Sequence, residues 1–280
     1  MRPADKKDGS PVDGIDLQKH ADMQTIFQFD NTFDGLLTAV FEAYSRRTFP
    51  DVLSVEGEPL PLFHDEVFTV VTDTAKAERV WKGVQKKLSA GALRCLTRSW
   101  LAEEAETPMV LFRYIRKVVD APRSIETNFA DPDVLAFARM WKRVETEKWH
   151  LIQFIRFQKA ADGTYFAAVE PEKDALPLVV DHFRDRLGDQ RWVVYDVGRS
   201  YGFYFDGQEV RHVTFADDSP VVRLVDGRLD EELMDKDERL FQQLWKTYFK
   251  AICIKERWNP RKHRQDMPVR YWKYLTEKQE

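Results

Sequence analysis

The stretch RWVVYDVGRSYGFYFDGQEVRHVTF (residues 191–215) decides the fold of the second half of the chain. It contains three short runs, at 191–197, 200–206 and 209–215, that are rich in β-branched and aromatic side chains, which favour strands. The dipeptide Asp206-Gly207 between the last two runs is typical of a tight hairpin turn. Short connections join antiparallel neighbours, so the stretch predicts three strands of an antiparallel sheet.

Two further strands and two helices are predicted around this stretch. LIQFIRF (151–157) and TYFAAVE (164–170) are separated by a turn and predict a β-hairpin. LPLVVDHFRDRLG (176–188) predicts a short amphipathic helix, and a long helix is expected at about 235–257. Residues 149–280 are therefore expected to form an α+β unit, in which an antiparallel sheet is packed by a long C-terminal helix.

The first half of the chain has mainly helical patterns. Strands are predicted at 25–30 and 66–73, and apolar residues recur at helical spacing in the segments 33–47, 75–88, 91–104, 108–119 and 130–150. The last of these segments either closes this unit or bridges to the next. Residues 22–148 are expected to form a mainly helical unit with a small sheet, and the polar residues 1–21 a disordered tail. The fold class predicted for the whole chain is α+β.

The composition excludes several classes of protein. The 280 residues include 43 Lys and Arg against 47 Asp and Glu, and the pI of about 6.0 is not that of a generally basic nucleic-acid binder. No apolar run approaches the roughly 18 residues of a membrane span, and the first residues lack the apolar stretch of a secretory signal. Cys95 and Cys253 make neither a disulfide framework nor a zinc pattern. We therefore expect a cytoplasmic protein with no membrane contact, no metal and no cofactor.

Familiar catalytic motifs are missing from the sequence. It contains neither the nucleotide-binding patterns G-x-G-x-x-G and G-x-x-x-x-G-K-[ST], nor the hydrolase pattern G-x-S-x-G, nor the zinc pattern H-E-x-x-H. The six histidines are scattered, and no two lie three or four positions apart. The sequence gives no reason to expect a metal site or a cysteine nucleophile.

Positive charge gathers at the end of the chain. Residues 246–280 contain ten Lys and Arg but four Asp and Glu, a net charge of +6, which leaves −10 for the rest of a chain whose total is −4. A basic segment on an acidic body suggests a local site for a polyanion.

The helix that begins this basic end has two predicted faces. Its apolar stripe is typical of core packing and consists of Leu240, Phe241, Leu244, Trp245, Tyr248, Phe249 and Ile252. Lys246, Lys250 and Arg257 fall within about 40° of one another at ~100° per residue, so they form a basic ridge beside the stripe. The ridge is either a binding surface or an ordinary solvated face.

The segment that follows, ERWNPRKHRQDMPVRYWKYLTE, interleaves cations with aromatic rings, and its dipeptides Asn259-Pro260 and Met267-Pro268 impose turns. Guanidinium groups bind phosphate oxygens in bidentate geometry, and exposed rings stack on unpaired bases. In the alternative interpretation, the rings lie in the core and the arginines brace acids. The candidate nucleic-acid-binding residues are Lys246, Lys250, Arg257, Trp258, Asn259, Arg261, Lys262, Arg264, Arg270, Tyr271 and Trp272.

Polar residues in or beside apolar elements form a weaker candidate site. The candidates for acid–base chemistry in a buried network are Glu147, His150, His182, Asp196 and Arg199. Asp196 ends one predicted strand and Arg199 opens the next, so a structural ion pair between them is the simpler interpretation.

A series of short motifs resembles one bacterial family. In order, the motifs are FDGLLTAVFEAY, KAERVWKGV, FIRFQ, LPLVVDHFRDR, W-V-V-Y-D with R-S-Y-G, LWKTYFKAICIKERWNP and MPVRYWKYLTE, within residues 22–280. Members of this family of unknown function are described as DNA-metabolism or DNA-repair proteins. They are typically encoded beside a radical-SAM protein, and in other bacteria the same module is fused ahead of a uracil-DNA-glycosylase-like domain. The resemblance implies a DNA-repair setting and a protein partner, and it supplies no catalytic residues.

Three functions remain open from the sequence. The first is a DNA-binding accessory protein that holds damaged or single-stranded DNA for a radical-SAM or glycosylase-like partner. The second is a hydrolytic enzyme that acts on DNA through a polar cluster around Glu147, His182 and Asp196. The third is a protein-interaction adaptor whose basic end meets an acidic partner.

Overall fold

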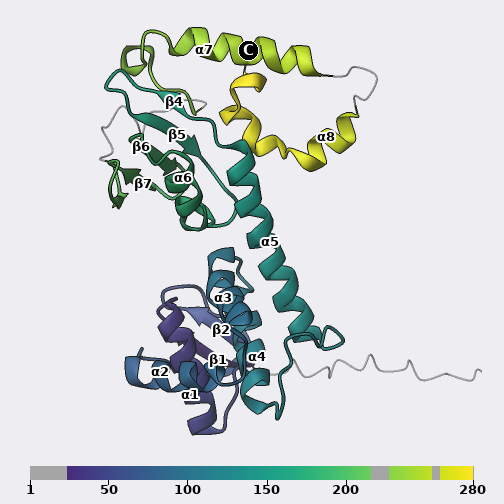
Figure 1. The fold of residues 1–280 in the computed structure, drawn as a ribbon. Coiled ribbons are helices and arrows are strands. Elements are labelled where there is room, and N and C mark those ends of the chain that lie inside the picture. Colours follow the sequence, from purple (N-terminus) through teal and green to yellow (C-terminus); the bar gives the residue numbers. More distant parts are fainter. Residues whose placement is uncertain (1–23, 216–226, 254–258, 280) are drawn as a thin grey trace, which may run out of the picture. The chain divides into compact units, whose positions relative to one another are not determined.

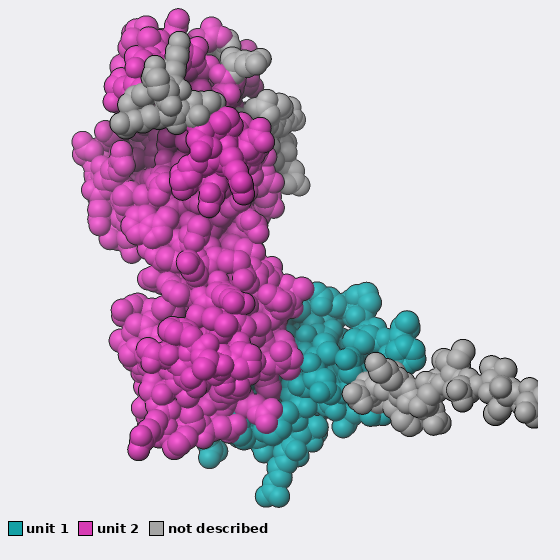
Figure 2. All heavy atoms as spheres, turned by 90° about the vertical axis from the view of Figure 1, so that its right-hand side faces the viewer, with its two compact units in different colours: residues 1–83 teal, residues 84–280 magenta. Residues whose placement is uncertain are grey.

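The computed structural model describes residues 24–215, 227–253 and 259–279. The chain forms two compact units, residues 1–83 and 84–280 (Figure 2). The expected disordered tail lies outside the described residues. The expected boundary between residues 148 and 149 falls inside one continuous helix, α5 (Pro132–Phe154).

The first unit contains a three-stranded sheet with the strand order β2-β1-β3, and both pairings are parallel. Parallel neighbours need a crossover connection, which the first helix provides between β1 and β2. The predicted strands at 25–30 and 66–73 are confirmed in type, and β2 is an additional strand. The elements are β1 (Gln24–Phe29), α1 (Phe33–Arg46), β2 (Val52–Val55), β3 (His64–Thr69) and α2 (Thr74–Gln85).

The second unit begins with α3 (Ala90–Ser99), η1 (Trp100–Ala102), α4 (Thr107–Asp120) and α5. The Asp131 carboxylate caps α5 by accepting hydrogen bonds from the backbone N–H groups of Asp133 and Val134, at 2.9 and 3.3 Å. Tyr114 of α4 stacks on Phe137 of α5 with ring centroids 4.0 Å apart, so the first half of α5 belongs to a helical core.

A five-stranded sheet with the order β4-β5-β6-β7-β8 follows α5 (Figure 1). The expectation of a fully antiparallel sheet is wrong at one pair, because β5 and β6 are parallel. The segments η2 (Leu176–Leu178) and α6 (Val180–Arg186) carry the chain across the sheet between these two strands. The strands are β4 (Gln158–Lys159), β5 (Tyr165–Val169), β6 (Trp192–Asp196), β7 (Tyr201–Phe205) and β8 (Val210–Val213).

The strand predicted at 151–157 is wrong. Residues 151–154 are the last turn of α5, and the backbone becomes extended at Ile155. The buried positions Val144, Glu147, Leu151 and Phe154 continue the helix period of three and four residues. Helical spacing therefore extends into a run of residues that also has a high preference for strands.

The two faces of the sheet contribute to separate apolar clusters. Ala167, Trp192 and Val194 face the cluster that also contains Leu151 and Phe154 of α5, and helix α6 contributes to it. The intervening residues of the same strands face the other cluster, as the alternation of side chains along a strand requires.

The C-terminal elements are η4 (Glu231–Leu233), α7 (Glu238–Ile252), α8 (Pro260–Asp266), η6 (Val269–Tyr274) and η7 (Thr276–Lys278). The long helix predicted at about 235–257 is therefore present as α7, and its predicted last residues lie outside the described part of the chain. The α+β fold class is confirmed. In the described ranges, the helices are too short or too polar to cross a membrane.

Candidate functional site

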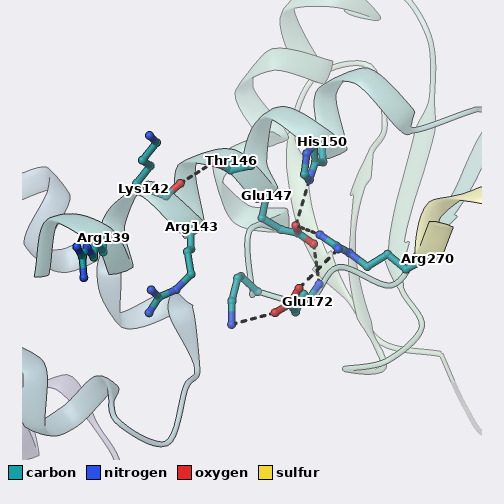
Figure 3. A pocket seen from close by; sticks show the side chains of 9 residues that line it. Arg139, Lys142, Arg143, Thr146, Glu147, His150, Glu172 and Arg270 are labelled. Carbon is teal, nitrogen blue, oxygen red and sulfur yellow. Dashed lines mark hydrogen bonds and ion pairs between the residues drawn. The ribbon is translucent and has the colours of Figure 1, made fainter. Parts of the chain in front are cut away.

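Glu147 of α5 is the centre of a buried polar cluster (Figure 3). Its side chain is 3% exposed and accepts a hydrogen bond from the Tyr271 hydroxyl at 2.8 Å and from the backbone N–H of Glu172 at 2.7 Å. The Arg270 guanidinium donates to the other carboxylate oxygen, and His150 Nδ1 lies 3.4 Å from that oxygen. Both oxygens of the carboxylate are therefore occupied by neighbours from four positions in the chain.

This environment fixes the charge of Glu147. Burial alone would raise the pKa of the carboxyl group, but hydrogen bonds from His150, Tyr271 and Glu172, together with the positive charge of Arg270, lower its pKa to about 2. A general acid or base needs a pKa near the working pH, so Glu147 is suited to holding its neighbours in place rather than to proton transfer.

Asp196 and Arg199 form a second polar cluster at the end of β6. The fully buried Asp196 carboxylate accepts hydrogen bonds from the Arg199 backbone N–H at 3.1 Å and from its Nη1 at 2.9 Å. This confirms the predicted ion pair. The same guanidinium donates to Glu103 Oε2 and to the backbone carbonyls of Pro171 and Glu172, so Arg199 joins three segments of the chain.

The two clusters meet at the loop that follows β5. Glu147 accepts from the backbone N–H of Glu172, while Arg199 donates to the carbonyl of the same residue. His182 is not among the hydrogen-bonding partners of either cluster: it packs edge-on against Phe183, and its Nε2 is buried without a described partner. The hydrogen bonds of Glu147, His150, Asp196 and Arg199 therefore serve to hold the loop after β5 in place. Among the described residues, no three His, Cys, Asp or Glu side chains are arranged to hold a metal ion.

A cavity of about 410 Å³ lies along α5 next to Glu147 (Figure 3). It is predominantly cationic, with five Lys and Arg side chains against two Glu. The residues that line it are Arg139, Lys142, Arg143, Thr146, Glu147, His150, Glu172, Lys173 and Arg270. This cavity was not predicted from the sequence, although the spacing of Arg139, Lys142, Arg143 and Thr146 along one helical face is a signal for it.

The cations of this cavity fall into two groups. Arg143 Nε and Lys173 Nζ lie 2.8 and 2.7 Å from the Glu104 carboxylate, so both are held by an acid. The side chains of Arg139 and Lys142 have no hydrogen-bond or ion-pair partner within the described ranges of the chain, and both residues are exposed. The cavity therefore contains two cations that a carboxylate holds in place and two cations that have no acid partner among the described residues.

The segment around η6 anchors the end of the chain. Tyr271 is 1% exposed, so the expectation that its ring faces solvent is wrong. Arg270 is exposed, and its guanidinium pairs with Glu147. Trp272 is half-buried against the sheet cluster, and its Nε1 donates to the Met267 carbonyl at 3.0 Å. The alternative interpretation, in which rings lie in the core and arginines brace acids, is confirmed for Arg270 and Tyr271.

Helix α8 presents the next group of predicted cations. The Asn259 side chain caps α8 by accepting from the Lys262 backbone N–H at 3.0 Å, which explains its place before Pro260. Arg261, Lys262 and Arg264 are exposed. Two predicted site residues lie outside the described part of the chain: Arg257 and Trp258.

Helix α7 exposes both of its faces. The expectation that its apolar stripe forms core is wrong, since Phe241 is 62% and Tyr248 is 55% exposed, and Trp245 is also exposed. Lys250 is exposed and Lys246 is half-buried; they line a shallow hollow of about 460 Å³ with Arg239, Gln242, Gln243 and Thr247. We call the side chains Phe241, Trp245, Lys246, Tyr248 and Lys250 the α7 surface.

The fold and these sites define an α+β protein with cationic surfaces on α5, α7 and α8. The chain belongs to a family described as a domain of unknown function (DUF4130), whose model matches residues 105–277. The matched region contains the α5 cavity and the α7 surface. No curated protein matches the chain, and no solved structure matches it.

Proposed function

We propose that this protein is a DNA-binding accessory protein in DNA repair or metabolism, which holds single-stranded or damaged DNA. The observation that carries the proposal is the α7 surface, where one exposed helix presents aromatic rings on one face and lysine side chains on another. The family resemblance adds the expected partner, a radical-SAM or uracil-DNA-glycosylase-like protein that acts on the bound strand.

The chemistry of the α7 surface suits a single strand. Lysine side chains neutralise backbone phosphates, and exposed rings stack on unpaired bases, which contributes about 1–3 kcal/mol per base. The helix carries three cations and one acid, Glu238 in its first turn. That acid is buried and accepts a hydrogen bond from the Lys159 backbone N–H at 3.1 Å, so it is directed away from solvent.

Arg261, Lys262 and Arg264 of α8 supply further phosphate contacts in this proposal. Lys262 Nζ pairs with Asp266 at 2.7 Å across one helical turn, and this pair is exposed on both sides. Exposed pairs of this kind contribute little to stability, so Lys262 exchanges its partner for a phosphate at low cost. The buried Tyr271 has a different role: with Arg270, it ties the end of the chain to Glu147 of α5.

The test is the binding of a fluorescent single-stranded 20-mer, measured by anisotropy at low salt. The double variant Lys246→Glu/Lys250→Glu is expected to lose at least about tenfold in affinity, because two phosphate contacts become repulsive. The double variant Lys86→Glu/Arg94→Glu has the same change in charge at exposed positions outside α7 and should bind like the unmodified protein. Equal affinity in all three proteins would contradict the proposal.

The exposed apolar side chains of α7 also favour the adaptor function as a second candidate. A largely exposed apolar stripe on a helix that also carries lysines suits an amphipathic helix of a partner that carries acids as well as its own apolar face. Copurification with the radical-SAM partner separates the two functions. A complex that survives nuclease treatment and is lost in Phe241→Ser/Tyr248→Ser supports the adaptor, whereas a complex that nuclease dissolves supports DNA as the link.

A further inference from the structure

We propose that the cavity along α5 is a second nucleic-acid site, which binds the sugar–phosphate backbone of a strand through Arg139, Lys142, Arg143 and Arg270. We call these four side chains, together with Thr146, the α5 groove (Figure 3). The ligand class rests on the proposed function, and the site itself rests on the geometry of α5.

The shape of the groove suits a repeating anion. Arg139, Lys142, Arg143 and Thr146 lie on one face of α5 at spacings of three and four residues, and His150 follows on the same face. From Arg139 to His150 the helix rises about 16 Å at 1.5 Å per residue. A single phosphate group is much shorter than this row, whereas a strand places a phosphate every few ångströms along it.

The groove holds some of its cations in place before any ligand arrives. Arg143 directs Nε and Nη2 at Glu104, and Arg270 directs Nη2 at Glu147. These two carboxylates are largely buried, with side-chain exposures of 17% and 3%, so they hold the guanidinium groups in place. Fixed donors lose less conformational entropy on binding than mobile ones.

The other cations of the groove carry charge that no described acid compensates. Within residues 24–215, 227–253 and 259–279, the Arg139 and Lys142 side chains have no acid partner. The Thr146 hydroxyl donates to the Lys142 carbonyl at 2.8 Å and adds a polar group to the same wall. Together these side chains give the groove a net positive charge and the donors that phosphate oxygens accept from.

The first measurement is chemical footprinting of lysines in the full-length protein. Limited acetylation followed by mass spectrometry reports the reactivity of each lysine with and without a single-stranded 20-mer. Lys142 should become at least about threefold less reactive when the strand is bound, because its amine contacts a phosphate. Lys86, which is exposed elsewhere, should keep its reactivity. Unchanged reactivity of Lys142 at saturating DNA would overturn the proposal.

The second measurement is the salt dependence of binding by Arg139→Gln/Lys142→Gln. Losing two phosphate contacts should reduce the slope of log affinity against log salt by about 1.4 and weaken binding about tenfold at 0.1 M salt. Both residues are exposed and unpaired in the described chain, so the variant should retain the stability of the unmodified protein. An unchanged slope and affinity would overturn the proposal.

These experiments test the α5 groove and the α7 surface independently. If Lys246→Glu/Lys250→Glu loses binding while the α5 variant keeps it, the proposed function stands and the α5 groove is not a strand site. If the α5 variant alone loses binding, the groove stands and the α7 surface does not. Polyglutamate of matched charge is the competitor: displacement of the strand at equal charge concentration would show an unspecific anion site and would overturn the assignment to nucleic acid.

Discussion

The hydroxyl of Tyr271 lies 2.8 Å from a carboxylate oxygen of Glu147, although 124 positions of the chain separate the two residues. This contact ties η6 to α5, next to the cavity that Glu147 lines. A buried polar contact therefore fixes the end of the chain. The rings of α7, by contrast, remain exposed.

The first prediction concerns the stability of this contact. Tyr271→Phe keeps the ring in the core and removes the hydrogen bond to a buried charge, so the free energy of unfolding should fall by about 2 kcal/mol. Urea denaturation followed by circular dichroism measures it. Tyr248→Phe is the control, because that ring is exposed on α7 and its variant should stay within about 0.5 kcal/mol. Equal stability of all three proteins would contradict the buried contact.

The second prediction concerns acid. The pKa of Glu147 is lowered from its ordinary value of 4.5 to about 2 in the folded protein. A lowered pKa stabilises the folded state fully above pH 4.5, and this contribution is lost as the pH falls toward 2. Glu147→Gln removes it, so the unmodified protein should exceed the variant by about 3 kcal/mol at pH 7.

The difference between these two proteins is measured by urea denaturation at several pH values. It should stay constant between pH 7 and 5 and become smaller below pH 4.5, where the unfolded chain takes up a proton. Other carboxyl groups titrate equally in both proteins and cancel in the difference. A difference that stays the same down to pH 3 would show that Glu147 does not have a lowered pKa.

The third prediction concerns Arg199. Its guanidinium binds Asp196, Glu103 and two backbone carbonyls, and an ammonium group does not reproduce this planar set of donors. Arg199→Lys should therefore lower the free energy of unfolding by about 2–4 kcal/mol. Arg211→Lys, whose pair with Asp206 is largely exposed, should change it by no more than about 0.5 kcal/mol. Comparable effects at both positions would argue against a structural role for Arg199.

The fourth prediction concerns the rings of α7. Tyr248→Ala should weaken binding of a single strand by about 5- to 150-fold, which corresponds to the loss of one stacked base. Its stability should hardly change, because the ring is exposed. Phe129→Ala removes another exposed ring outside α7 and should leave the affinity unchanged. Loss of affinity in both variants to the same degree would indicate unspecific contacts.

Strands β5 to β8 of the second sheet could be predicted from the sequence, because alternation and turn residues are local signals. The end of α5 could not, since the run 151–157 has the composition of a strand although Leu151 and Phe154 continue the period of the helix. The local sequence did not show that β5 and β6 run parallel either, because the direction of a pair depends on where the intervening α6 packs.

The sequence predicted several of the polar residues that belong to the candidate site, but it did not predict most of the contacts between them. The sequence suggested that Asp196 pairs with Arg199, three positions away, but Arg270 finds Glu147 across 123 positions, a partner that only the folded chain defines. The stripe of α7 has the spacing of a core helix, and spacing alone does not say whether another element covers it.

The most direct test of the central claim is the salt dependence of single-strand binding by the unmodified protein, measured by anisotropy. We predict micromolar or tighter affinity at 50 mM NaCl that falls steeply as the salt is raised, because bound phosphates displace counterions. No detectable binding at 50 mM NaCl, or an affinity indifferent to salt, would contradict the claim that this protein holds a nucleic-acid strand.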